Sequence, residues 1–140
     1  MQVQAYILFD GRCEEALDFY RKALNAEVVM MLRNKENPEP QGNVSMPGIE
    51  EKILHATSKI GQTEVMASDG YAKGKPEFKG ITLSLSPATE AEAKKIFTAL
   101  SDGGQVQMPL AKPFTRRASA CCLTALACRG WSSSPVRCKQ

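Results

Sequence analysis

His55 is the only histidine in this 140-residue chain, and it stands within the apolar stretch KILHATSKI, residues 52–60. A neutral imidazole can bind a divalent metal or share a hydrogen bond with a substrate oxygen. One histidine does not make a metal site, however, because protein zinc sites use at least three protein ligands. The alternative role for His55 is a partly buried, hydrogen-bonded histidine within a strand.

Two further residues could take part in binding or catalysis. Asp69 ends the stretch EVMASDG and could orient a polar substrate, although Asp before Gly is also a common turn former. Cys13 lies where a helix is expected to begin, and a helix dipole there would favour the thiolate. Because no histidine is paired with it, Cys13 could equally be a half-buried core residue. The methionines Met30, Met31, Met66 and Met108 could line an apolar pocket or fill the core.

The first 70 residues carry short apolar runs that would position these side chains. Asp10-Gly11 is a turn signal before a helix whose apolar residues recur at three- and four-residue steps. Asn25 suits the left-handed residue that follows a helix, and Gly61-Gln62 suits a two-residue hairpin turn. Residues 34–51 are expected to form a long loop. The predicted order is strand, helix, strand, strand, strand, at residues 3–9, 13–24, 27–33, 52–60 and 63–69.

A fainter copy of this pattern follows a linker at residues 71–80. Residues 81–86 alternate like a half-buried strand. Thr89 and Glu92 form a capping box that opens a helix, which Gly103 or Gly104 would end. Residues 105–110 would form one more strand.

The pattern therefore predicts an α+β fold with two modules. Residues 1–70 form a first βαβββ module, and residues 81–113 form a partial second module of strand, helix and strand. A complete repeat would need two more strands. Residues 114–140 show neither strand alternation nor a helical stripe, so we expect an irregular tail.

Several stretches together resemble one protein family over residues 2–114. The stretches are FDGRCEEALDFYRKALNAEV, KILHATSKIG, EVMASDG, GKPEFKG and ALSDGGQVQMPLAKPF. They resemble the PhnB-like branch of the vicinal oxygen chelate superfamily, the glyoxalase, bleomycin-resistance and dioxygenase fold. The resemblance implies two βαβββ modules whose curved mixed sheet surrounds a cleft, incomplete here after about residue 110.

The resemblance also implies a function class. An intact relative would be a cytoplasmic homodimer that binds a small molecule, acting as a metal-assisted lyase, isomerase or dioxygenase. The alternative is a non-catalytic protein that sequesters a small molecule. A further reading is a demethylubiquinone methyltransferase by family label alone, which the sequence disfavours because no glycine-rich nucleotide loop follows a strand.

Metal-dependent members of the superfamily take ligands from the first and last strands of both modules. The first three of these positions fall here near Gln4 or Ala5, Met66 or Ala67, and Gly80 or Ile81, and the fourth would lie in a missing strand. Only Gln4 can coordinate a metal, so we expect no standard metal site, and the use of a divalent cofactor stays open. We therefore expect His55, Gln4 and Asp69 to contact the substrate.

The tail holds four of the five cysteines and the only tryptophan. With serine codons of the TCN type, a two-base shift of reading frame turns WSSS, residues 131–134, into four codons with T in the middle. Every such codon encodes Phe, Leu, Ile, Met or Val. We interpret the tail as a frameshifted copy of the Trp-containing apolar strand with which the look-alike proteins end. The alternative is a divergent metal-binding tail that uses Cys121, Cys122, Cys128 and Cys138, although their spacing is not CxxC.

Charge is distributed unevenly along the chain. All 15 Asp and Glu lie in residues 1–110, with 12 of the 18 Lys and Arg, so residues 111–140 are basic. A basic arm can bind phosphates, but six charges spread among Ala, Cys and Ser form no cluster, and we expect no nucleic-acid partner. The N-terminal stretch is not a signal peptide, and no apolar run is long enough to span a membrane. The sequence therefore predicts a cytoplasmic protein with no membrane partner.

Overall fold

The structure is a computed structural model of the chain. It describes residues 1, 3–38, 48–71, 83 and 85–102, together with the backbone of residues 105–106 and 135–136. The chain divides into two compact units, residues 1–76 and residues 77–140.

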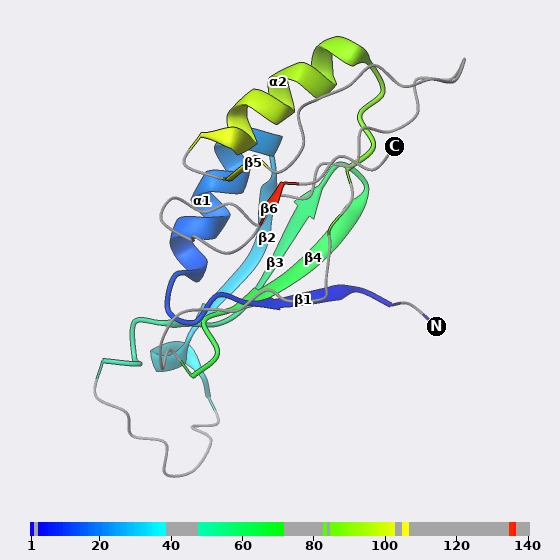
Figure 1. Cartoon of the computed structure of the whole chain (residues 1–140). Helices are drawn as coiled ribbons and strands as arrows, with labels where there is room; N and C mark the ends of the chain where they lie inside the picture. Colours follow the sequence, from blue (N-terminus) through cyan, green and yellow to red (C-terminus); the bar gives the residue numbers. More distant parts are fainter. Residues whose placement is uncertain are drawn as a thin grey trace. The chain divides into compact units, whose positions relative to one another are not determined.

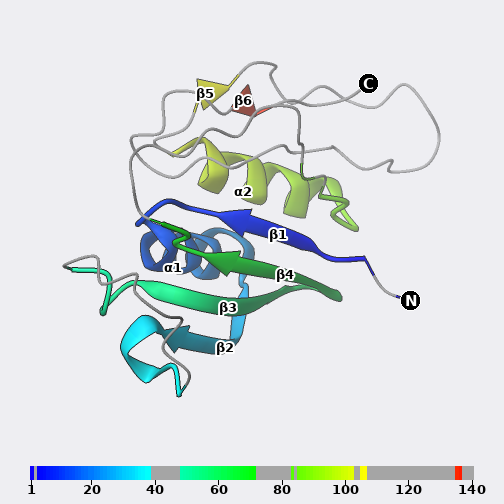
Figure 2. The ribbon, with the colours of Figure 1, turned by 90° about the horizontal axis from the view of Figure 1, so that it is seen from below.

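The first unit is a four-stranded mixed sheet with one helix on one of its faces (Figures 1 and 2). The strand order is β1-β4-β3-β2, in which β1 runs parallel to β4 and the other neighbours are antiparallel. The sequence predicts this βαβββ order. In chain order the elements are β1 (Ala5–Leu8), α1 (Cys13–Leu24), β2 (Glu27–Arg33), the 3₁₀ helix η1 (Asn34–Glu36), β3 (Ile53–Ile60) and β4 (Thr63–Ser68).

Helix α1 forms because its apolar residues fall on one side, with Cys13, Ala16, Leu17 and Tyr20 buried. The helix contacts β3 and β2. Asn25 follows it in the left-handed conformation, with φ of 54°, as predicted. At the other end, the side chain of Arg12 makes no capping hydrogen bond. The beginning of α1 therefore takes its cap from elsewhere in the unit.

The turn between β3 and β4 is the predicted two-residue hairpin. Ile60 pairs with Thr63, which leaves Gly61 and Gln62 as the turn. Gly61 has a φ of +61°, a conformation that residues with a Cβ rarely adopt. The hairpin thereby fixes the register of the two strands.

The core of the first unit lies between the sheet and α1. Ile7, Ala67 and Ala56 pair across β1, β4 and β3, and all three are buried, so this row faces the helix. Phe9 and Ile53 are the largest fully buried side chains in this unit, and Cys13 is a smaller one. The small alanines let α1 approach the sheet closely.

Strand β2 is an edge of the sheet and is irregular. Its pairing with β3 shifts register between Val28 and Met30 and again between Leu32 and Arg33. Such bulges are common at sheet edges, where they bend the strand. Met30 and Met31 are 44% and 42% exposed, so the interpretation of these two methionines as core residues is wrong.

The second unit contains the helix α2 (Glu90–Ser101). The Oγ1 atom of Thr89 accepts a hydrogen bond from the N–H of Glu92 at 3.1 Å, as the capping box predicts. The carboxylate of Glu92 accepts from the N–H of Ala88 at 2.9 Å, one residue before the cap itself. The predicted glycine stop at Gly103 or Gly104 lies outside the described residues.

Two expectations for the second half can be compared with the structure at a few residues only. Of the predicted strand 81–86, Leu83, Leu85 and Ser86 are described, and none of them lies in a strand. An alternating pattern makes a strand only where a neighbouring strand pairs with it. Within the tail, the described strand β6 (Pro135–Val136) pairs in parallel with β5 (Gln105–Val106).

The other tail predictions fall outside the part of the chain that the structure describes. These are the apolar pattern behind residues 131–134 and the four tail cysteines. Met108 also lies outside it. Neither α1 nor α2, the two α-helices among the described residues, is long and apolar enough to cross a membrane.

Candidate functional site

The face of the sheet opposite α1, called the open face here, carries aromatic and polar side chains. Because successive residues of a strand point to opposite faces, the residues next to Ile7 point away from the helix. Tyr6 is one of them, and it pairs with Met66, which pairs with Thr57. In Figure 2 the sheet lies in front of α1, and no other described element of the first unit covers the open face.

Tyr6 and His55 meet on the open face. The Oη atom of Tyr6 lies 3.2 Å from the Nδ1 atom of His55. The two ring centroids are 5.5 Å apart, and the ring planes are inclined by 35°. Tyr6 lies on β1 and His55 on β3, so the pair reaches across β4. Tyr6 is 46% exposed and His55 is half-buried, which leaves both rings accessible from this face.

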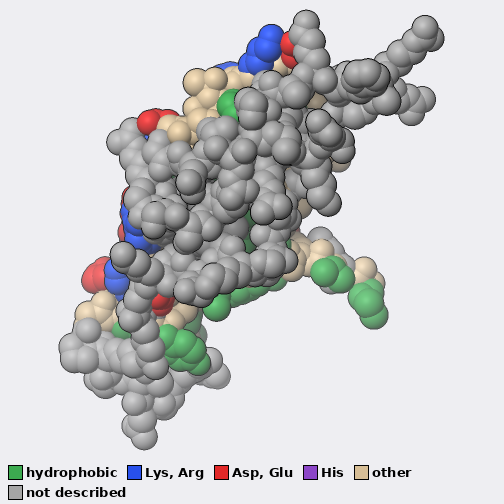
Figure 3. Space-filling model, viewed as in Figure 1, with side chains coloured by type: hydrophobic (Ala, Val, Ile, Leu, Met, Phe, Trp, Pro, Cys, Tyr) green, Lys and Arg blue, Asp and Glu red, His purple; other side chains and the backbone are tan. Residues whose placement is uncertain are grey.

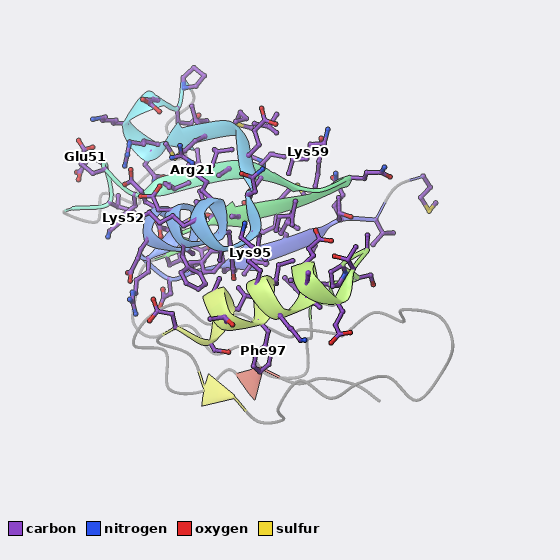
Figure 4. The ribbon with its side chains drawn as sticks, turned by 90° about the horizontal axis from the view of Figure 1, so that it is seen from above. Arg21, Glu51, Lys52, Lys59, Lys95 and Phe97 are labelled. Carbon is purple, nitrogen blue, oxygen red and sulfur yellow. The ribbon has the colours of Figure 1, made fainter. Side chains whose placement is uncertain are left out.

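Gln4 belongs to a second, more polar part of the open face. Its Nε2 atom donates to Oε2 of Glu64 at 3.0 Å, and Glu64 pairs with Lys59. Figure 4 places Lys59 toward the hairpin end of β3. Lys59 is four residues along the strand from His55, a separation of about 13 Å. Gln4 and His55 therefore share a face but do not meet.

The described residues do not fit a metal ion. Among them no group of three or more His, Cys, Asp or Glu side chains is close enough to hold one. Metal ligands must converge to about 2 Å from one ion. Side chains that stand upright on a sheet cannot do so across the distance between His55 and the Gln4–Glu64 pair. On the open face, the described residues thus form the Tyr6–His55 pair, but they do not form a set of metal ligands.

Asp69 is placed away from solvent, with only 2% of its surface exposed. One carboxylate oxygen accepts from the N–H of Cys13 at 2.6 Å, and the other accepts from the N–H of Ile53 at 2.8 Å. The N–H of Asp69 in turn donates to the carbonyl of Ile53 at 2.9 Å. Asp69 thereby supplies the cap at the beginning of α1 that Arg12 does not supply. This geometry favours its structural role over that of a substrate contact.

Cys13 is fully buried at the first turn of α1. Its backbone N–H is directed to Asp69, and its side chain belongs to the core under the sheet. A reactive thiolate needs partial exposure and a positive neighbourhood. Burial therefore favours the alternative in which Cys13 is a core residue.

A charged cluster holds the chain where β2 ends and β3 begins, where Figure 4 labels Glu51. Arg33 donates from Nη2 to Glu14 at 2.7 Å and from Nη1 to the carbonyl of Glu51 at 2.6 Å. The hydrogen bond to Glu14 raises the pKa of Arg33. Lys35 donates to both carboxylate oxygens of Glu51, at 2.7 Å and 2.9 Å, and this hydrogen bond lowers the pKa of Glu51. These charges pair with one another and fix the loop ends.

The residue type and local sequence of Tyr6 do not mark it as a binding residue. The only sequence feature that points to Tyr6 is the alternation in VQAYILF, which places Gln4, Tyr6 and Leu8 on one side of a strand. Figure 3 shows hydrophobic side chains along β1 and toward the N-terminus, and Leu8 is 53% exposed. This alternation does not reveal the partner of Tyr6, because His55 is 49 residues away in sequence and two strands away in the sheet.

Comparisons with known proteins cover most of the chain. The family model described as 3-demethylubiquinone-9 3-methyltransferase matches residues 1–125, beyond residue 114 where the resemblance was expected to end. Protein YjdN of Escherichia coli (strain K12) is 28% identical over 123 residues, which is 81% of this chain and 82% of YjdN.

Two solved structures are similar in fold as well. Protein PA1353 from Pseudomonas aeruginosa has a TM-score of 0.73 and 30% identity, covering 97% of this chain and 95% of that chain. The PhnB protein from Bacillus cereus has a TM-score of 0.64 and 27% identity, covering 81% and 84%. The chain therefore belongs to the PhnB-like family, the one described as 3-demethylubiquinone-9 3-methyltransferase, and with it to the glyoxalase, or vicinal oxygen chelate, superfamily.

Proposed function

We propose that the chain binds a small unsaturated molecule on the open face, with His55 and Tyr6 as its main contacts. The observation that carries the proposal is the Tyr6–His55 pair itself, two accessible rings joined at 3.2 Å on a sheet face that α1 does not cover. Binding sites commonly combine apolar and aromatic walls with a few polar groups that fix orientation. Leu8 and Met66 supply apolar neighbours on the same face.

Non-catalytic binding is favoured over metal-assisted lyase, isomerase or dioxygenase chemistry. The support is the separation of the donors on the open face, because His55 and the Gln4–Glu64 pair lie too far apart to share an ion. A divalent metal that copurifies with the chain and is lost in His55→Ala would instead favour the enzyme. The homodimer and the cytoplasmic location that the resemblance implies belong to this proposal as well.

The name of the family points to the first ligand to test. It mentions a ubiquinone precursor, a ring that carries oxygen atoms. A soluble benzoquinone has that shape and can be followed by isothermal titration calorimetry. We expect it to bind, and we expect His55→Ala to weaken binding by up to about tenfold, the value of one hydrogen bond.

The control for this experiment is Lys22→Ala, an exposed change on α1 on the other side of the sheet. It should leave the affinity unchanged. Equal affinity in the His55→Ala variant and the unmodified chain would overturn the proposal, and so would an equal loss in both variants.

A further inference from the structure

The hydrogen bond between Tyr6 and His55 constrains which nitrogen of His55 carries the proton. The contact is made to Nδ1 of the imidazole. In a neutral imidazole one ring nitrogen is a donor and the other is an acceptor. A phenol O–H is a better donor than an imidazole N–H, and an imidazole nitrogen is a better acceptor than a phenol oxygen. The stable arrangement therefore has the Tyr6 hydroxyl donating to Nδ1.

The second nitrogen, Nε2, is left for a ligand. It makes no hydrogen bond to any residue that the structure describes, and His55 itself is only half-buried. When Nδ1 accepts from Tyr6, Nε2 must carry the proton of the neutral ring.

We propose that Tyr6 is a positioning residue that holds His55 as the Nε2–H tautomer, so that the open face selects ligands with an acceptor oxygen, such as a ring carbonyl. This inference rests on the proposed function, because it names the class of ligand for the same site. A histidine held the other way round would present a lone pair at Nε2 and select a donor instead. In this selection Tyr6 acts through the imidazole, in addition to the contact that its ring makes with the ligand.

The tautomer can be measured directly because His55 is the only histidine of the chain. The full chain labelled with ¹⁵N-histidine gives one pair of ring nitrogens in a long-range proton–nitrogen correlation spectrum. At a pH where the spectrum shows a neutral ring, we expect the proton on Nε2. Tyr6→Phe keeps the ring and removes the hydroxyl, and it should shift the signals toward a mixture of the two tautomers. A proton on Nδ1 in the unmodified chain would overturn the inference.

The selection is tested with acetophenone and α-methylstyrene, two molecules of nearly equal shape in which a carbonyl oxygen replaces a methylene group. We expect acetophenone to bind about three- to tenfold more tightly, as one hydrogen bond allows. In Tyr6→Phe the ratio of the two affinities should fall toward one, because the imidazole is no longer held as the Nε2–H tautomer. The amide spectrum of the variant confirms that it is folded.

The possible failures are distinguishable. Equal affinity for the two probes in the unmodified chain would overturn the inference while leaving binding at the open face intact. Absence of binding by the benzoquinone and by both probes would overturn the proposed function and the ligand class together. A ratio that stays unchanged in Tyr6→Phe would remove Tyr6 from the selection.

Discussion

Asp69 joins three elements of the first unit through its hydrogen bonds. Its two carboxylate oxygens satisfy one N–H at the beginning of α1 and one at the beginning of β3. A buried backbone N–H without a partner costs about 1–3 kcal/mol, so the carboxylate stabilises the junction of three elements at once. The sequence predicts the turn at Asp69 from its Gly neighbour. It cannot predict the two donors, which lie 56 and 16 residues away.

Asp69→Asn tests this role. An asparagine keeps one acceptor oxygen and turns its NH₂ group toward the other backbone N–H, so we expect the free energy of unfolding to fall by about 2–3 kcal/mol. Urea denaturation followed by circular dichroism measures it. Asp18→Asn, an exposed change on α1, is the control and should cost less than about 1 kcal/mol. Equal costs for the two variants would show that Asp69 is not the cap.

At the scale of elements, features encoded by neighbouring residues were predictable. The bounds of α1, the left-handed Asn25, the Gly61-Gln62 turn and the Thr89 cap each depend on a few adjacent residues. A strand at 81–86 is harder to predict, because a strand depends on partner strands that adjacent residues do not reveal. The Tyr6–His55 pair was missed for the same reason, since it needs the register of β1, β4 and β3 together.

In the connection from β2 to β3, the ion pair between Lys35 and Glu51 makes the titration of the Glu51 carboxylate depend on Lys35. The hydrogen bond from Lys35, with the charge of Lys35 adding to it, lowers the pKa of Glu51. A carboxylate with a lowered pKa in the folded state contributes stability that is present above its unfolded pKa and is lost as the pH falls through the folded pKa. The pair is exposed, so its contribution to stability is small.

Lys35→Met should therefore raise the pKa of Glu51 toward its ordinary value. Carboxyl ¹³C shifts followed against pH by NMR measure this directly. Lys22→Met, on the exposed face of α1, is the matched control and should leave the titration of Glu51 where it is. A pKa of Glu51 that stays equally low in Lys35→Met would mean that Lys35 is not the cause.

At the scale of the whole molecule, the main prediction concerns the tail. The frameshift interpretation states that WSSS replaces an apolar strand. Restoring the frame from about codon 114 would place four apolar residues at 131–134, each contributing about 1.5–3 kcal/mol when buried. We expect the restored chain to gain several kcal/mol in its free energy of unfolding, measured by urea denaturation.

The matched comparison is a chain without residues 114–140. If the present tail adds little to the core, its removal should change the free energy of unfolding by much less than restoring the frame does. A restored chain no more stable than the present one would contradict the frameshift interpretation. Sequencing the coding DNA around codons 113–116 tests the same point, since an intact homologous gene should differ there by one or two bases.

The parallel pairing of β1 with β4 also bears on the order in which the protein is made. Ala5 pairs with Val65, so β1 has no partner in this sheet until some 60 further residues have left the ribosome. Contacts between residues so far apart in sequence form late. Tyr6 lies on β1, so the Tyr6–His55 pair can form only when this strand docks. A ligand present during synthesis would therefore favour the finished sheet over its unpaired precursor by mass action.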